Sequence, residues 1–178
     1  ISMKKLVLNL RYPRKQFNNK IIEKGIELFD IFCVKIGEIQ EIGYNAIINQ
    51  IKGSIGDDIE INFAELLRPI QALNIVYPFD MDDIDNINMN DYVGKEGLES
   101  IMNFRLKDKK KIDFSYKEDK EKIFKLENIG KYSRKIENIC ENIINSEGII
   151  LIYSRYIDGG LIPVALALEE LGFNRYGG

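Results

Sequence analysis

The sequence predicts an α/β fold in which incomplete pieces of parallel sheet are joined by a mixed helical insert. A helical face over 136–144, a continuous apolar run over 148–153 and an apolar helix over 161–171 follow one another, which is half of a doubly wound unit. A strand-like segment over 26–36 followed by a helical pattern over 38–52 forms a second regular pair. A chain of 178 residues has room for one sizeable core or for pieces of two domains.

The N-terminal strand and helix are recognised by a change in the spacing of apolar residues. Residues 26–36 are rich in β-branched and aromatic residues with polar residues between them, as in a strand of a partly buried sheet. From Glu38 to Lys52 the apolar residues recur at three- and four-residue spacing; they are Ile39, Ile42, Ala46, Ile47 and Ile51. Gly53 then supplies a helix stop.

The region 53–128 has weaker patterns. Helical spacing over 63–73 predicts short helices that are interrupted at Pro69. The acidic stretch over 80–86 lacks the glycine and the terminal glutamate of a calcium loop, so it is interpreted as a solvated loop. Two further elements are predicted, a short helix over 97–104 and an alternating strand over 109–117.

The C-terminal region carries the clearest elements. Its first helix ends near Gly148, and the apolar face of that helix consists of Ile136, Ile139, Cys140, Ile143 and Ile144. The run 148–153 has the length of a strand, and a continuous apolar run is typical of a parallel strand that is covered on both faces. The chain then turns through 158–160 into a helix over 161–171, which is apolar enough to be buried on more than one side.

Composition excludes several classes of protein. With 45% hydrophobic and 30% charged residues, the chain is globular rather than disordered, and its net charge of −3 argues against a generally basic surface, so any nucleic-acid contact must be local. Because there is no histidine, a structural metal site is not expected. Cys33 and Cys140 are interpreted as reduced core residues of an intracellular protein. No signal peptide or transmembrane segment is predicted.

Three stretches carry a family resemblance. Residues 34–44 look like the strand and the "Q, then Y" helix that close the first motor domain of Swi/Snf-like enzymes. Residues 68–78, RPIQALNIVYP, look like a connecting segment, and 130–173 is similar to the opening of the second motor domain. The chain therefore resembles, from about Phe29 onward, the helicase-like proteins of large cytoplasmic DNA viruses, superfamily 2 motors of the DEAD-box and Swi/Snf type with two RecA-like domains.

The resemblance implies a division of the chain into the end of a first RecA-like domain (1–52), a connecting insert (53–128) and the truncated start of a second RecA-like domain (129–178). The parent protein would then be an ATP-dependent helicase or translocase acting on DNA or RNA in viral transcription or genome handling, in the host cytoplasm or the virion. ATP and Mg²⁺ would be held by motifs outside this chain. The Gly-Lys pairs at 94–95 and 130–131 lack the Ser or Thr of a phosphate loop, so this chain alone is not expected to be an enzyme.

The candidate nucleic-acid contact follows the predicted C-terminal strand, because ligands of α/β sheets bind at the carboxyl ends of strands. Ser154 and Arg155 can donate to a phosphate oxygen. The N–H groups of Gly159 and Gly160 open a helix whose dipole favours an anion. The competing interpretation is structural: Ser154 ends the strand, Asp158 caps the helix and the glycines form the turn. Both interpretations stay open at this point.

Two further features have simpler interpretations. Gln40 and Tyr44 lie one helical turn apart and are candidates for packing against a neighbouring domain. The basic cluster over 107–111 is nearly balanced by acidic neighbours and is interpreted as a solvated face. As an alternative to the motor, the sequence admits a non-catalytic, helicase-like interaction module such as a transcription-factor subunit. The exposed apolar surface expected of incomplete sheet pieces also predicts self-association.

Overall fold

A computed structural model describes residues 15, 19–21, 31–54, 63–83, 88–108 and 111–175. The chain forms two compact units, Ile1–Cys33 and Val34–Gly178, and each is described by itself. In the first unit an isolated antiparallel bridge joins Lys15 to Ile21. Asn19, between them, has a positive φ of 63°, the conformation that asparagine adopts in tight turns.

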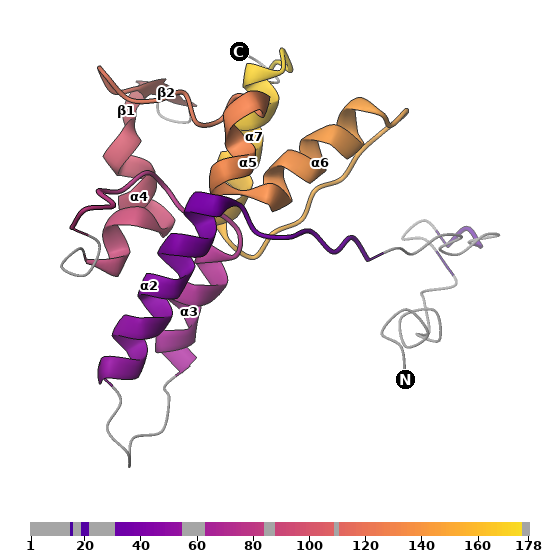
Figure 1. Ribbon diagram of the computed structural model, residues 1–178. Coiled ribbons are helices and arrows are strands. Elements are labelled where there is room, and N and C mark those ends of the chain that lie inside the picture. Colours follow the sequence, from indigo (N-terminus) through magenta and orange to yellow (C-terminus); the bar gives the residue numbers. More distant parts are fainter. Residues whose placement is uncertain are drawn as a thin grey trace. The chain divides into compact units, whose positions relative to one another are not determined.

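The second unit is a mixture of helix and strand (Figure 1). Its elements are, in order, α2 (Glu38–Ser54), α3 (Phe63–Ala72), the 3-10 turn η1 (Met89–Tyr92), α4 (Gly94–Ile101), β1 (Met102–Asp108), β2 (Lys111–Tyr116), α5 (Leu126–Tyr132), α6 (Arg134–Ile144), the wide turn η2 (Ile157–Leu161) and α7 (Ile162–Glu170). Among the described residues the strands form a two-stranded antiparallel sheet. A parallel sheet is not shown in this part of the chain.

Helices α2 and α3 lie side by side (Figure 1). The helix predicted over 38–52 is confirmed as α2, whose first turn carries Glu38 and Glu41 at the positive end of the helix dipole. The interruption predicted at Pro69 is wrong, because α3 continues through it to Ala72. Proline removes one helical hydrogen bond, but Pro69 is buried, and the burial of its ring offsets that loss.

The strand predicted over 109–117 is confirmed as β2. The short helix predicted over 97–104 is confirmed only as far as Ile101 in α4, because residues 102–104 belong to strand β1. Strand β2 pairs with β1 so that Phe104 lies opposite Phe114. Their ring centroids are 5.1 Å apart in an edge-to-face arrangement. Aromatic pairs of this kind stabilise antiparallel strands, so the hairpin is supported by side chains as well as by backbone bonds.

Ser133 joins the two helices α5 and α6. Its hydroxyl accepts a hydrogen bond from the Ile136 N–H at 3.0 Å, which caps α6, and donates to the Asn74 carbonyl at 2.5 Å. Just before α2, Gly37 brings the chain against the backbone of α5, where a Cβ at position 37 would collide with the carbonyl groups of Gly130 and Lys131. Backbone therefore packs directly on backbone at this place.

Residues 149–153, called the open strand below, have no strand pairing with any other described segment. The sequence predicts a parallel strand buried on both faces, whereas the structure assigns no strand pairing to this segment. The largest exposures are those of Ile149 (103%), Leu151 (93%) and Tyr153 (88%). Ile150 is less exposed and Ile152 packs on the core. This alternation of exposure has the period of a strand with one face on the protein, but the predicted burial on both faces is wrong.

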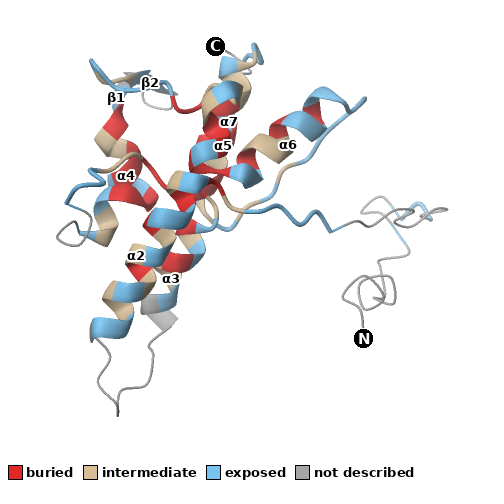
Figure 2. Ribbon diagram, viewed as in Figure 1, coloured by how far each residue is buried: buried red, intermediate tan, exposed pale blue. Residues whose placement is uncertain are grey.

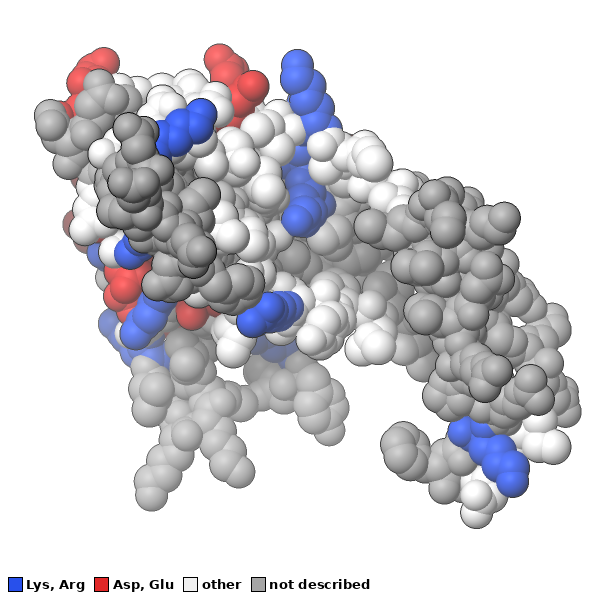
Figure 3. Space-filling view, turned by 90° about the horizontal axis from the view of Figure 1, so that it is seen from below, with Lys and Arg blue, Asp and Glu red and all other residues white. Residues whose placement is uncertain are grey.

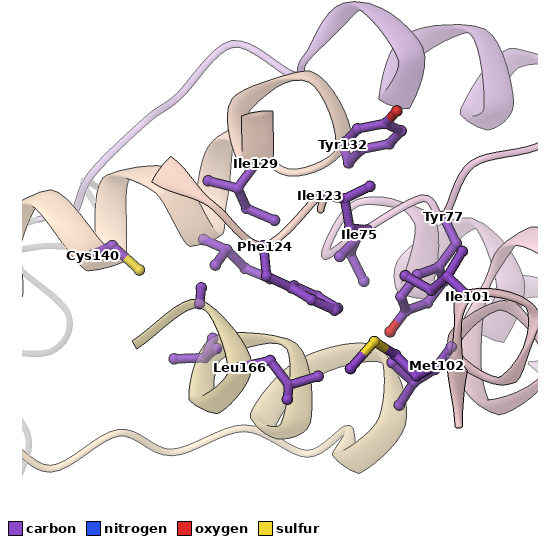
Figure 4. Packing of buried hydrophobic residues seen from close by; sticks show 14 residues of the cluster. Ile75, Tyr77, Ile101, Met102, Ile123, Phe124, Ile129, Tyr132, Cys140 and Leu166 are labelled. Atoms are coloured by element: carbon purple, nitrogen blue, oxygen red, sulfur yellow. The ribbon is translucent and has the colours of Figure 1, made fainter. Parts of the chain in front are cut away.

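The main core gathers residues from α4 to α7 and from the segment after α3. Figure 4 shows Phe124, which is 1% exposed, between Ile129 of α5 and Leu166 of α7. The helix predicted over 161–171 is confirmed in η2 and α7, and its buried residues are Gly159, Gly160, Pro163, Val164, Leu166 and Ala167. A second cluster consists of Ile47, Ala72, Val76, Tyr92 and Val93. Figure 2 shows the buried residues concentrated on α4, α5 and α7.

The two cysteines differ. Cys140 is buried in the main core, as predicted, and burial raises the pKa of its thiol to about 11. Cys33 is exposed, so its assignment to a core is wrong. Its apolar neighbours Ile31 and Phe32 are themselves 49% and 66% exposed, and they provide no interior for it. Both thiols are free.

Candidate nucleic-acid interface

A pocket of about 510 Å³ opens between α3, the start of α4 and the turn that precedes α7. Its lining comes from three segments that are far apart in sequence: Leu67, Arg68 and Gln71; Asn90, Val93, Gly94, Lys95 and Glu96; and Arg155, Tyr156, Ile157, Asp158 and Gly159. The second unit alone supplies all of these residues. The pocket therefore joins the connecting-segment motif to the turn after the open strand.

The pocket wall carries both signs of charge. Arg68, Lys95 and Arg155 contribute three cations, and Glu96 and Asp158 contribute two carboxylates. The Arg68 guanidinium is oriented, because its Nε donates a hydrogen bond to Asn90 Oδ1 at 2.8 Å. Lys95 forms an exposed ion pair with Glu99 at 3.6 Å, which is weak in water. An anionic ligand would meet three cations, of which Arg68 is held by Asn90 and Lys95 only weakly by Glu99.

The start of α4 adds a backbone donor surface to the pocket. Gly94, the first residue of α4, has a positive φ of 62°, and a Cβ there would lie 2.5 Å from Gln71 Oε1. A side chain at this position would be strained, so glycine lets α3 approach α4 closely. Val93 precedes the helix and provides no side-chain cap. No N-cap side chain therefore competes for the first N–H groups of α4, and free N–H groups at a helix start favour an anion.

The turn after the open strand is fixed by hydrogen bonds. The Tyr77 hydroxyl donates to the Asp158 carbonyl at 2.7 Å, and the Tyr156 N–H donates to Ser154 Oγ at 3.1 Å. Burial, and then the nearby charge of Asp158, raise the pKa of Tyr77 well above its ordinary value, so the phenol stays protonated and remains a donor. A Cβ at Gly160 would lie 2.5 Å from Ser154 Oγ, so a glycine is needed there for the turn to close.

The four residues predicted to contact nucleic acid have two different positions. Arg155 and Gly159 line the pocket. Ser154 and Gly160 contact each other behind it, and the Ser154 hydroxyl is used to hold the turn. The structural interpretation is confirmed only in part: Ser154 and the glycines hold the turn, but neither η2 nor α7 begins with a side-chain cap bond, so the predicted cap by Asp158 is wrong. Contact of Arg155 and Gly159 with nucleic acid stays a prediction.

Arg68, Lys95 and Gly94 were not among the residues predicted for this site. The sequence signal is partial, since the RPIQ stretch belongs to the connecting segment and the Gly94-Lys95 pair lacks the Ser or Thr that would mark a phosphate loop. Their proximity depends on α3 packing against the turn, where Gly159 lies within ordinary contact distance of Gln71 and Gly94. This proximity cannot be predicted from the spacing of the residues along the sequence.

Gln40 and Tyr44, the packing candidates, lie away from the pocket. Gln40 is 1% exposed and its amide joins three segments. Its Nε2 donates to the Ala72 carbonyl at 2.8 Å, and its Oε1 accepts from the N–H groups of Gly37 and Arg134 at 3.2 and 3.4 Å. Tyr44 is half-buried against the second cluster. Gln40 thus packs between α2, α3 and α6, and a role between domains stays a prediction.

Elsewhere the charges are dispersed. On the face seen in Figure 3, basic and acidic side chains are interspersed among uncharged ones. Residues 109 and 110 of the predicted basic cluster lie outside the described residues. No group of His, Cys, Asp and Glu side chains suited to a metal ion occurs in the described ranges, and none of the helices described there is long and apolar enough to cross a bilayer.

The pocket is thus a mixed-charge hollow between a connecting helix, a helix N-terminus and a strand-end turn. Comparisons of the chain with protein-family models, with curated proteins and with solved structures found no match.

Proposed function

We propose that this chain is part of an ATP-dependent helicase or nucleic-acid translocase of the kind found in large cytoplasmic DNA viruses, and that the pocket contacts the nucleic-acid backbone. The observation that carries the proposal is the convergence of Arg68, Lys95 and Arg155 around one hollow with the start of α4. A phosphate needs charge and N–H donors that converge on it. The chain has a net charge of −3, so a local site is the arrangement required.

The mixed charges suit a backbone contact of limited strength. Three cations can neutralise phosphates, whereas Glu96 and Asp158 oppose long residence of an anion. A motor that moves along a strand must release each contact in turn, so moderate affinity is compatible with translocation. Contacts to phosphate carry no sequence information, and binding is therefore expected to be sequence-independent.

At the level of the parent protein, the division proposed from the resemblance is 1–52, 53–128 and 129–178, with the first and last parts belonging to two RecA-like domains. The order α6, open strand, turn and α7 supports this, because it is the helix, strand and helix order of a doubly wound unit. ATP and Mg²⁺ would be bound by parent residues outside this chain, and ATP-driven domain closure would move the nucleic acid.

Binding of a fluorescent single-stranded oligonucleotide to the purified chain tests the proposal. The double variant Lys95→Gln/Arg155→Gln should bind roughly tenfold more weakly at low salt, and the magnitude of the log–log salt slope should fall by about 1.4 because two phosphate contacts to a single strand are lost. The matched control is Lys120→Gln/Lys122→Gln, two exposed lysines outside the pocket. Equal losses in both double variants would show that any two cations suffice and would remove the pocket from the proposal.

The parent protein offers a second test. Ser154→Ala together with Arg155→Ala should weaken nucleic-acid binding and leave ATP affinity unchanged, because the triphosphate is held elsewhere. The purified 178-residue chain should show no ATP turnover with or without nucleic acid. Turnover that resists substitution of Lys95 and Lys131 would reveal a nucleotide site that the motifs do not indicate.

A non-catalytic interaction module is the second candidate. It is favoured by exposed apolar residues on α3, namely Leu66 (41%), Ile70 (39%) and the following Leu73 (38%), which lie at helical spacing. The flanking reading frame discriminates the two functions. An upstream phosphate loop and a downstream arginine motif favour the motor, whereas intact flanking domains that lack both favour the module.

A further inference from the structure

A second pocket, of about 320 Å³, lies between the hairpin, the segment before α5 and the end of α7. It is called the acidic–aromatic pocket below, because its lining includes the rings of Phe114, Tyr116 and Phe124 and the carboxylates of Glu169 and Glu170. Two side chains of the main core, Met102 and Leu166, complete the lining beside Phe124 (Figure 4). Ring faces and carboxylates both attract positive charge, so this lining suits a cation.

A guanidinium group of the chain itself lies at this pocket. Arg175 Cζ is 5.1 Å from the centroid of the Phe114 ring. Its Nε and Nη2 donate to the two carboxylate oxygens of Glu169, the second at 2.8 Å. The hydrogen bond with Glu169 chiefly, and the charge of Asp113 to a smaller extent, raise the pKa of Arg175. A planar fork that bonds both oxygens and lies over a ring is a geometry that arginine adopts and lysine cannot.

The arm that carries Arg175 is a short extension of α7. Gly172 has a positive φ of 93°, and the N–H groups of Gly172 and Phe173 donate to the carbonyls of Glu169 and Leu168, both at 3.0 Å. This is the turn that commonly ends a helix at a glycine. Residues 172–175 are all exposed, so the arm is held at the pocket mainly by the contacts of Arg175. Exposed ion pairs are weak in water, and an arginine from another polypeptide can therefore exchange with Arg175.

The pocket also has space and charge that Arg175 leaves unused. Its volume of about 320 Å³ is open with Arg175 in place. Glu170 lines this open part, is exposed, and shares a hydrogen bond with the Tyr116 hydroxyl, which holds its carboxylate beside the ring. Two carboxylates therefore line a pocket at which one guanidinium is bound, and the remaining negative charge favours a further cation.

We propose that the acidic–aromatic pocket binds an arginine side chain of a partner polypeptide, and that Arg175 holds this position until the partner displaces it. The incoming guanidinium takes the place of Arg175 over Phe114 and forks onto Glu169, while Glu170 supplies the second negative charge. Arg175 is thus an internal competitor that sets the affinity for the partner. The proposal uses none of the residues that line the pocket between α3, α4 and η2, so it is independent of the proposed function.

Titration of the full 178-residue chain with the peptide acetyl-Gly-Arg-Gly-amide, followed by the NMR shifts of the Phe114 and Tyr116 rings, measures this binding. Arg175→Gln should tighten binding about fivefold, because the internal competitor is removed. In that background Glu169→Gln should weaken binding about tenfold, because the charged, bidentate pair is lost. Glu147→Gln, which removes an exposed carboxylate outside the pocket, is the matched control and should leave the dissociation constant unchanged.

Two further peptides test the chemistry of recognition. Replacing arginine by lysine in the peptide should weaken binding about fivefold, because an ammonium group cannot form the fork. Replacing it by citrulline, which keeps the shape and removes the charge, should abolish the ring shifts. Glu169→Asp keeps the negative charge, so it should bind the arginine peptide more tightly than Glu169→Gln does. Unchanged circular dichroism of these variants shows that the fold is retained.

Three results would overturn the proposal: equal affinity for the arginine and citrulline peptides, an affinity that Arg175→Gln leaves unchanged, or an equal loss of affinity in Glu147→Gln and Glu169→Gln. The first would show that charge is not recognised, the second that Arg175 does not occupy the binding position, and the third that general surface charge attracts the peptide. Oligonucleotide binding should be unchanged by Glu169→Gln, so failure of either proposal leaves the other standing.

Discussion

Strand β2 and the open strand are both predicted from the local pattern of apolar residues, yet only β2 is paired. Its partner β1 lies immediately before it in the sequence, so the two meet at a small cost in loop-closure entropy. The open strand is flanked by α6 and the turn into α7, and parallel partners require a crossover connection. Apolar pattern therefore indicates an extended conformation, while pairing depends on a second strand within reach.

The two regions also differ in what they contribute to the core. The ring of Tyr116, at the end of β2, has its centroid 6.0 Å from that of Phe124, and the Tyr116 hydroxyl accepts a hydrogen bond from the Phe124 N–H at 3.1 Å. The open strand contributes only its inward side chains, chiefly Ile152. A strand that is anchored by both its backbone and its side chains should be far more important for stability.

The largest expected contrast is between Phe124→Ala and Leu151→Ala. Removing the buried ring should lower the free energy of unfolding by about 3–5 kcal/mol, whereas truncating the 93% exposed leucine should change it by less than about 0.5 kcal/mol. Urea denaturation at a protein concentration where the chain is monomeric measures both. A cost above about 2 kcal/mol for Leu151→Ala would break the comparison, because it would require the open strand to be buried in the monomer.

Hydrogen exchange should show the next largest contrast. In dilute solution, amides of β1 and β2 that bond across the hairpin should exchange at least about 100-fold more slowly than those of the open strand. Protection of the open strand equal to that of the hairpin would instead indicate that another segment of the chain pairs with it.

Three tyrosine-to-phenylalanine variants sharpen the comparison on a smaller scale. Tyr77→Phe, at the turn after the open strand, removes one hydrogen bond and should cost about 1 kcal/mol. Tyr116→Phe, at the end of β2, removes the acceptor of the Phe124 N–H and a hydrogen bond with Glu170, and should cost about 1–2 kcal/mol. Tyr92 is the matched control. Its buried hydroxyl has no hydrogen-bond partner, so Tyr92→Phe should be neutral or slightly stabilising. Thermal melts at fixed concentration distinguish these outcomes.

The Tyr92→Phe variant should also change how stability depends on pH. Burial raises the pKa of Tyr92 from its usual 10.0 to about 12. Because the unfolded chain loses this proton first, stability is fully present below pH 10.0 and falls as the pH rises toward 12. Tyr92→Phe should make the decline between these values shallower. An unchanged alkaline profile would mean that the Tyr92 hydroxyl is not buried in solution.

Sequence reasoning succeeded where structure is local. Helices α2, α6 and α7 follow from three- and four-residue spacing, because one apolar face is encoded within each segment. It failed at Pro69, where tertiary burial outweighed a helix-breaking residue, and at the open strand, where the predicted burial required neighbours that the described residues do not supply. Propensity is a weak guide whenever contacts distant in sequence decide the outcome.

For the candidate site too, local features could be predicted from the sequence and contacts between distant segments could not. The turn after an apolar strand could be anticipated, and it delivers Arg155 and Gly159 to the pocket. Arg68 and Lys95 could not be assigned to it, because only the packing of α3 and of α4 on the turn η2 brings them there. The helicase-like function and the boundaries at 52 and 128 stay predictions.

The contact at Gly37 restricts how this sequence can change during evolution. Any side chain there would enter the space of the Gly130 and Lys131 carbonyl groups, and backbone cannot move aside as a flexible side chain can. Substitutions at position 37 should therefore be purged by selection while its exposed neighbour Lys35 varies freely. A divergent relative that retains the packing of α2 on α5 should keep a glycine before the helix even where little other identity survives.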